Sequence, residues 1–210
     1  DPDQLFAYAQ SLGYELYDGS LRGTRGTLWS AAGNSADQSS LLIAMLRASG
    51  IPARYRHGAL SQTDAQTLIA DMFPEPTQYV GHLEESLETA DPVNDPALIA
   101  QAQDHWWVEA YLPGLGWTDL DPSFPTAQIG DSFATPAGDG TDRIAELPDT
   151  TRHKVTIRLK VEDFYPLNLG QSGLDYTYPL SHTFRTVELS AEPVAFSHVV
   201  HTENQGGLVF

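Results

Sequence analysis

The stretch that decides the fold begins Gly33-Asn34-Ser35-Ala36-Asp37 and runs on to Arg54. Ser35 to Gln38 fits a capping box, in which Ser35 caps a helix and Gln38 reaches back to its start. An apolar face follows at helical spacing, made by Leu41, Leu42, Met45 and Leu46 and widened by Ile43 and Ala44. The pattern predicts a central helix over Ser35–Ser49, buried on most sides, followed by a strand over Ala53–Leu60.

A second informative stretch reads His105-Trp106-Trp107-Val108-Glu109-Ala110-Tyr111. Its side chains alternate as in a strand: His105, Trp107, Glu109 and Tyr111 point one way, and Trp106, Val108, Ala110 and Leu112 the other. Pro113-Gly114-Leu115-Gly116 predicts a hairpin turn. A return strand over Trp117–Asp121 then carries Trp117, Asp119 and Asp121 on one face.

The register of this hairpin decides whether His105 and Asp121 can meet. Three registers are open, which pair Tyr111 with Leu115, Leu112 with Gly116, or Leu112 with Trp117. The first sets the imidazole opposite the carboxylate, and the second makes them diagonal neighbours on one face. The third sends them to opposite faces.

These stretches supply the parts of an acyl-transfer triad, namely a hydroxyl at a helix start, an imidazole on a strand and a carboxylate on the next strand. Each part also has an ordinary structural interpretation. Ser35 is a favoured helix cap, His105 can be a structural strand residue, and Asp121 with Pro122 can form a turn. Asp119 shares the face of Asp121 and is a second candidate carboxylate.

The chain resembles the transglutaminase-like superfamily, whose fold is similar to that of the papain-type cysteine proteases, over roughly residues 3–124. The matching pieces are Gly33 to Asp37, Leu46-Arg47-Ala48-Ser49-Gly50-Ile51-Pro52-Ala53-Arg54, His105 to Tyr111, and Gly116 to Pro122. The resemblance implies that Ser35 stands at the position of the nucleophilic cysteine, that His105 is the base and that Asp121 orients it. The Gly-Asn-Ser-x-Asp-Gln form looks like a bacterial branch found in large secreted or surface proteins, which implies an extracellular or cell-surface location.

Asp119 and three further residues are candidates for a substrate cleft around Ser35. Trp29 lies in the segment that leads to the helix and can line the cleft or donate to an oxyanion, or it can be a packed loop aromatic. Trp107 shares the face of His105 and can wall a groove. Asn34 directly precedes Ser35.

Composition narrows the range of partners. The net charge is −17, from 28 Asp and Glu against 11 Lys and Arg, which argues against nucleic acid and anionic membrane surfaces. The chain has no cysteine, which excludes disulfides. No apolar run is long enough to span a membrane. We expect no cofactor and no metal, and a peptide or protein as substrate or ligand, whereas the oligomeric state stays open.

The rest of the chain divides at residue 148. We expect an α+β domain over 1–148, in which a central helix packs on an antiparallel sheet and residues 61–104 form an insertion, followed by a β-rich extension over 149–210. The remaining predicted elements are a first helix ending before Gly13, a long loop over Gly19–Gly33, helices at Ser61–Phe73 and Pro96–Gln103, and strands at Arg152–Glu162, Thr183–Leu189 and Pro193–Val200.

Serine in place of cysteine shapes the functional hypotheses. A thiol beside an imidazole is partly ionised at neutral pH, whereas a hydroxyl is not. The favoured hypothesis is a catalytically impaired relative that acts as a peptide-binding or structural module of a larger surface protein. The alternative is an active acyl-transfer enzyme, such as a peptidase, an amidase or a transglutaminase-type enzyme. A third possibility, a spacer domain, would have an occluded groove.

Overall fold

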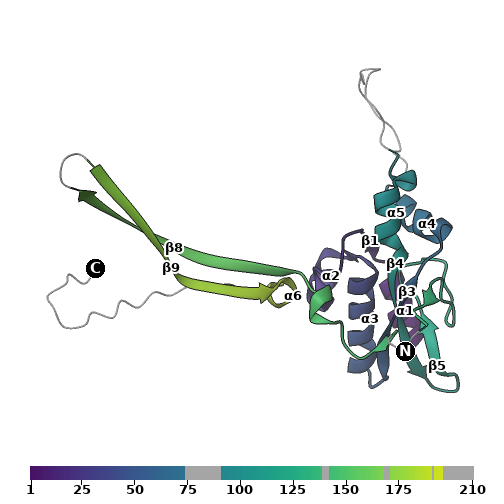
Figure 1. Ribbon diagram of the computed structural model, residues 1–210. Coiled ribbons are helices and arrows are strands. Elements are labelled where there is room, and N and C mark those ends of the chain that lie inside the picture. Colours follow the sequence, from purple (N-terminus) through teal and green to yellow (C-terminus); the bar gives the residue numbers. More distant parts are fainter. Residues whose placement is uncertain (74–90, 139–141, 168–170, 191, 196–210) are drawn as a thin grey trace, which may run out of the picture.

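A computed structural model describes residues 1–73, 91–138, 142–167, 171–190 and 192–195. Helices pack against an antiparallel sheet, and a two-stranded ribbon projects from this body, which confirms the predicted α+β class (Figure 1). The helices are α1 (Pro2–Gln10), α2 (Gly23–Ser30), α3 (Ser35–Ala48), α4 (Gln62–Met72), α5 (Pro96–Gln103) and α6 (Thr186–Leu189), with 3-10 turns η1 (Pro92–Asn94) and η2 (Asp149–Thr151). The strands are β1 (Gly13–Tyr14), β2 (Ala32–Gly33), β3 (Ala53–Ala59), β4 (Asp104–Leu112), β5 (Gly116–Leu120), β6 (Thr135–Pro136), β7 (Arg143–Ile144), β8 (Lys154–Leu167) and β9 (Gln171–Arg185).

The central helix α3 forms where the sequence predicts it, but its cap is Asn34. The Asn34 side chain accepts a hydrogen bond from the backbone N–H of Asp37 at 2.9 Å, and its own backbone is extended, as a cap requires. The prediction that Ser35 caps the helix is therefore wrong, because the neighbouring asparagine takes that position. Gln38 donates to the carbonyl of Gly13 at 3.2 Å instead of reaching back to the helix start.

The main sheet has the strand order β5-β4-β3-β6, and the short strand β7 also pairs with β3. Leu112 pairs with Gly116 in the β4–β5 hairpin, which is the second of the three predicted registers. The strand β5 ends at Leu120, and Asp121 follows it directly. This register keeps Asp121 on the same face of the hairpin as His105.

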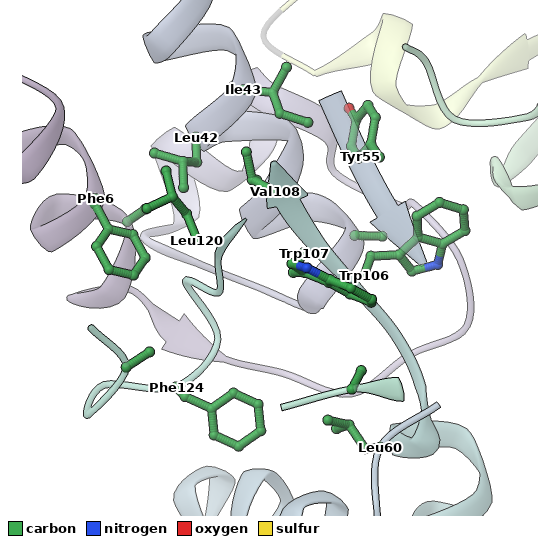
Figure 2. Packing of buried hydrophobic residues seen from close by; sticks show 14 of the residues in the cluster. Phe6, Leu42, Ile43, Tyr55, Leu60, Trp106, Trp107, Val108, Leu120 and Phe124 are labelled. Carbon is green, nitrogen blue, oxygen red and sulfur yellow. The ribbon is translucent and has the colours of Figure 1, made fainter. Parts of the chain in front are cut away.

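The hydrophobic core lies between α3 and this sheet. Leu42 and Leu46 of α3 and Val108 of β4 are fully buried, and Figure 2 shows Leu42 and Ile43 approaching Val108. Most of β4 is buried on both faces, with only Asp104 and Tyr111 exposed. The alternation of side chains that predicts the strand therefore divides them between two buried faces, and not between a buried face and a solvent-exposed one.

A network of ion pairs includes side chains on the face of β3 and β4 on which Trp107 also lies. The buried guanidinium of Arg56 donates to Glu109 at 3.2 Å, to Asp119 at 3.4 Å and to Asp142 at 2.8 Å. The Cζ atom of the Arg56 guanidinium also lies 5.1 Å from the centre of the Trp107 ring. Each buried charge in this network therefore has at least one opposite charge beside it, as burial demands.

The predicted loop over Gly19–Gly33 is wrong in its centre, where α2 forms and leads into β2. Two glycines at positions 23 and 26 hid this helix, because glycine is a poor helix former. Tertiary packing overrides that propensity, since α2 lies against α3 and α6 (Figure 1). A Cβ at Gly26 would come 2.8 Å from the Arg22 side chain and 3.0 Å from Ser190, so the small residue permits close packing.

The C-terminal part is one long hairpin followed by a short helix. The predicted strand Arg152–Glu162 lies mostly within β8, which continues to Leu167. The predicted strand Thr183–Leu189 is wrong beyond Arg185, because residues 186–189 form α6. Of the predicted strand Pro193–Val200, residues 193–195 are not in a strand and the remainder lies outside the described residues.

The start of this extension is hydrogen-bonded to the segment before α2. The backbone N–H of Ser20 donates to the carbonyl of Thr151 at 2.7 Å, and the N–H of His153 donates to the carbonyl of Ser20 at 3.0 Å. Gly19 has a positive φ of 62°, and a Cβ there would lie 2.1 Å from the Thr151 carbonyl oxygen. Only glycine fits this contact without a shift of the backbone.

Within the parts of the chain that the structure describes, none of the helices has the length and apolar character needed to cross a membrane.

Candidate active site

Ser35 is the first residue of α3 and is almost completely buried. Its hydroxyl oxygen accepts a hydrogen bond from the backbone N–H of Trp106 at 3.3 Å. Trp106 follows His105 on β4, so the helix start meets the strand beside the candidate base. Because Asn34 supplies the helix cap, the Ser35 hydroxyl is not used for capping, and the ordinary structural interpretation of this serine does not apply.

His105 and Asp121 form a fully buried pair. The Nε2 atom of His105 lies 3.1 and 3.0 Å from the two carboxylate oxygens of Asp121, which also accepts from the N–H of Ser123 at 3.3 Å. A carboxylate accepts hydrogen bonds, so Nε2 carries a proton. Among the described residues the other ring nitrogen, Nδ1, has no hydrogen-bond partner, and the Ser35 hydroxyl does not donate to it.

Asp37 holds the segment in front of the helix. Its buried carboxylate accepts from the hydroxyls of Tyr17 at 2.8 Å and Ser20 at 2.6 Å. It also accepts from three successive backbone N–H groups, those of Leu21, Arg22 and Gly23 at 3.1, 2.7 and 2.9 Å. A buried carboxylate at a helix N-terminus is well satisfied by such donors. Asp37 therefore fixes the chain that passes beside Ser35.

Asn34 holds the same segment from the other side. Its side-chain amide donates to the carbonyls of Tyr17 at 2.8 Å and Gly19 at 2.6 Å. Burial first, and then the neighbouring Asp37 carboxylate, raise the pKa of Tyr17 well above its usual 10.0. Burial, and then the nearby Asp121 carboxylate, raise the pKa of Tyr14 in the same direction. Both phenols are therefore neutral around Ser35 at physiological pH.

A narrow crevice adjoins Ser35. It encloses about 10 Å³, roughly the room that one water molecule needs. Its walls come from the segment before α2, from the start of α3, from α5 and from β4; they include Tyr14, Tyr17, Asp18, Asn34, Gln101, Asp104 and Trp106. The crevice is thus too small for a peptide side chain in the described conformation.

A wider recess of about 450 Å³ shares Asp18, Gly19 and Asp104 with the crevice. Its other wall is formed by Thr150 to His153 at the start of the C-terminal extension. Residues 101 and 104, at the end of the stretch predicted to be an insertion, line the crevice, and Gln101 donates to Asp18 at 2.7 Å across it. Sequence reasoning named neither Gln101 nor Asp104.

The structure does not bring the remaining cleft candidates to Ser35. Trp29 lies on α2 with 75% of its surface exposed and is not among the residues that line the crevice. Trp107 is fully buried and donates from Nε1 to Asp119 at 2.9 Å. Asp119, whose pKa burial raises above 3.8, belongs to the Arg56 network and not to the His105 pair. Of the four candidates, only Asn34 borders the crevice.

Sequence reasoning also missed Asp37, the residue with the largest number of hydrogen bonds around this site. The signal was present, because an aspartate in the first turn of a helix is a common acceptor for backbone N–H groups. The serine, glycine and tyrosine donors of residues 17–23 lie well before it in the sequence, and only the fold shows that they converge on it.

Comparison with known proteins bears on the same residues. A family model described as the transglutaminase-like superfamily matches residues 4–122, a stretch that contains Ser35, His105 and Asp121. Searches of curated proteins and of solved structures found no match.

Proposed function

The chain belongs to the transglutaminase-like superfamily, and we propose that it is a catalytically impaired member that serves as a peptide- or protein-binding or structural module. The proposal includes a setting in a larger bacterial surface or secreted protein. Its acidic, cysteine-free composition is compatible with that setting.

The observation that carries the proposal is the hydrogen bonding of Ser35. An activated serine donates its proton to the imidazole, whereas the Ser35 oxygen accepts from the Trp106 N–H and makes no hydrogen bond to His105. A hydroxyl has too high a pKa to ionise without such a base. The imidazole and its carboxylate are therefore in place beside a side chain that is a poor nucleophile.

The closed crevice supports catalytic impairment, and it is also what a spacer domain would have. Space for about one water molecule beside Ser35 does not admit an acyl group together with its leaving group. The recess beyond it has a volume of about 450 Å³, which is in the size range of sites that bind small molecules. A ligand in that recess would contact Asp18, Asp104 and the start of the C-terminal extension without reaching Ser35.

One observation favours the alternative, an active acyl-transfer enzyme. Asp121 orients His105, and the unpartnered Nδ1 can accept a proton. In that case Nδ1 takes the Ser35 proton while Oγ bonds to the substrate carbonyl carbon, and the imidazolium then protonates the leaving amine. Water then attacks the acyl group on Ser35, His105 takes a proton from the water and returns one to the Ser35 oxygen, and the acid is released.

A fluorophosphonate probe separates the two functions. It phosphonylates serine hydroxyls that a base activates, and the adduct at Ser35 is detected by intact mass and peptide mapping. We expect no labelling of Ser35 in the wild-type protein. Labelling that disappears in His105→Ala would establish the active enzyme and overturn the proposed impairment.

The variant Ser35→Cys tests whether the serine is the cause of the impairment. Because the chain has no cysteine, this variant carries a single thiol. We expect iodoacetamide to alkylate it near pH 6 at least tenfold faster than in the double variant Ser35→Cys/His105→Ala, since the imidazolium stabilises the thiolate. Equal rates in the two variants would show that His105 does not act on residue 35.

A further inference from the structure

A pocket of about 300 Å³ lies where the C-terminal extension meets α2 and α3. Its walls come from the start of α2, from α3 and β3, from the segment after β7, and from Arg152 and α6 of the extension. Among the described residues, it shares no lining residue with the crevice beside Ser35. Its volume is at the lower end of the range of small-molecule sites, so a ligand held here would be small and would not contact Ser35.

Three arginines line this pocket, namely Arg25, Arg47 and Arg152. All 11 Lys and Arg of the chain lie within the described residues. Eight of them have a carboxylate partner there, and these are Arg22, Arg25, Arg54, Arg56, Arg143, Lys154, Lys160 and Arg185. The three without one are Arg47, Arg152 and Arg158. In a chain with 28 acidic residues an unpaired arginine is the exception, and two of the three exceptions line one pocket.

The two unpaired arginines are held in place by different contacts. Arg47 donates from Nε and Nη2 to the carbonyl of Ala53 at 3.1 and 2.9 Å, and from Nη2 to that of Ala145 at 2.7 Å. These bonds fix the side chain of Arg47 but leave its charge without a counterion. The main chain of Arg152 is bridged to Ser20. The Arg152 side chain is half-buried, and its guanidinium makes no hydrogen bond or ion pair with any described residue.

Tyr55 shows that both guanidinium groups lie near one point of the pocket. This tyrosine is buried, and its hydroxyl donates to Oγ of Ser40 at 3.0 Å. Burial is the main cause that raises the pKa of Tyr55 above 10.0, whereas the hydrogen bond with Ser40 and the charges of Arg152 and Arg47 act in the opposite direction. Two unpaired cations are therefore close enough to act on the same buried hydroxyl.

Two carboxylates limit the positive charge of the pocket. Arg25 pairs with Glu192, and Glu146 is itself one of the lining residues. Three arginines against two glutamates leave a local net charge of +1, whereas the whole chain carries −17. The field of the protein as a whole repels anions. An anion bound here would therefore be held by the pocket and not by a general attraction to the surface.

We propose that this pocket binds a tetrahedral oxyanion with two negative charges, of the phosphate or sulfate type, either free or carried by a small molecule. A guanidinium presents N–H donors in a planar fork that matches the oxygens of such groups. One fork can satisfy a planar carboxylate, whereas Arg47 and Arg152 come from separate elements and call for oxygens in more than one direction. A dianion supplies the charge that both of them lack. The inference does not depend on Ser35 or on the function proposed for it.

Titration of the full chain with sodium sulfate, followed by ¹H–¹⁵N NMR, tests the proposal. The ionic strength is held constant with NaCl, because screening alone changes the field of this acidic protein. We expect saturable shifts that are largest for the amides of Thr24, Tyr55 and Arg152, which line the pocket. The absence of saturable shifts up to about 20 mM sulfate, or saturable shifts confined to other parts of the chain, would overturn the proposal.

Three further anions define the ligand. Acetate should bind at least tenfold more weakly than sulfate, and equal binding would overturn the assignment of a tetrahedral dianion. Inorganic phosphate and O-phosphoserine separate the two sources of the group. Binding of the ester at least threefold tighter than that of the free ion would support a ligand that carries the group, and the reverse order would support the free ion.

Single substitutions test the residues. Arg152→Gln should weaken sulfate binding at least tenfold. Arg158→Gln is the matched control, because Arg158 also lacks a carboxylate partner but lies on β8 outside the pocket, and it should change binding by less than twofold. Glu146→Gln should tighten binding at least threefold, since it removes a like charge from the wall. Unchanged binding in Arg152→Gln, or equal losses in Arg152→Gln and Arg158→Gln, would overturn the proposal.

Discussion

Asp121 accepts a hydrogen bond from Nε2 of His105 at 3.0 Å, and both side chains are shielded from solvent. A buried imidazole needs such an acceptor, because an unsatisfied N–H in the interior loses its hydration without compensation. The pair is therefore part of what stabilises the fold, whether or not it supports catalysis.

Replacement of Asp121 tests this structural contribution. We expect Asp121→Ala to lower the free energy of unfolding by about 1–3 kcal/mol, because it leaves Nε2 without an acceptor. Asp121→Asn keeps an amide oxygen at the same place and should lose clearly less. Urea unfolding measures both, and equal losses would show that the hydrogen bond to His105 contributes little.

The cap of α3 gives a second prediction. Asn34→Ala removes the acceptor for the Asp37 N–H and the two donors to Tyr17 and Gly19, so it should cost at least ~1–2 kcal/mol. Ser35→Ala removes one long hydrogen bond, from the Trp106 N–H, and should cost less, about 0.5–1 kcal/mol. Thermal unfolding of the two variants compares them. The reverse order would mean that Ser35 is the true cap.

Tyr14 predicts a loss of stability in alkali. Its pKa is raised above 10.0 in the folded protein by burial and by Asp121, so the unfolded chain releases this proton at a lower pH than the folded one. The unfolded state then binds fewer protons, and stability falls as pH rises above about 10, by up to ~1.4 kcal/mol per pH unit for one group. Urea unfolding at pH 8, 9, 10 and 11 measures the slope. Tyr14→Phe should make it shallower, and an unchanged slope would contradict the assignment.

Arg56 is expected to be the most sensitive residue of the ion network. Arg56→Ala takes away the nearest partner of the buried Asp142 carboxylate and one of the guanidinium groups that contact Glu109, and it should cost about 3–5 kcal/mol. Arg143 contacts the same two carboxylates but is 43% exposed, so Arg143→Ala is the matched control and should cost within about 1 kcal/mol. Chemical unfolding of the pair tests whether burial makes the difference.

Gly19 and Gly50 form another matched pair. Both have a positive φ, but a Cβ at Gly50 meets no atom within 4 Å, whereas one at Gly19 would lie 2.1 Å from the Thr151 carbonyl oxygen. Alanine at either position should cost about 1–2 kcal/mol for the backbone conformation. Gly19→Ala should cost about 1–3 kcal/mol more, because the backbone must also move. Similar losses in the two variants would show that the Thr151 contact yields easily.

Much of the fold could be predicted from local patterns. Leu41 to Leu46 at helical spacing predict α3, and the alternation from His105 to Leu112 predicts β4. The register of the hairpin stayed open among three choices, because the Pro113–Gly116 turn is compatible with several loop lengths. The cap was misplaced by one residue, since asparagine and serine are both good caps and only the backbone angles at Asn34 decide between them.

The missed features depend on contacts between distant residues. The helix α2 has weak intrinsic propensity and forms because it packs on α3. In β9, Gly173 and Pro179 hide the strand pattern, which only the pairing with β8 reveals. Trp107 was expected to face a groove, but the sheet face that it shares with Arg56 is covered, so its indole is sealed in the interior. None of these outcomes follows from the neighbours in sequence.

The hydrogen bonds between Ser20 and residues 151 and 153 bear on how this protein can be divided. A fragment ending at residue 148 would keep every residue of the family match yet expose polar main-chain atoms on the segment that Asp37 and Asn34 anchor. The N-terminal region and the C-terminal extension are thus joined by main-chain hydrogen bonds. A genetic exchange that replaces one of them with a foreign counterpart would have to keep residues 149–153 together with the N-terminal region.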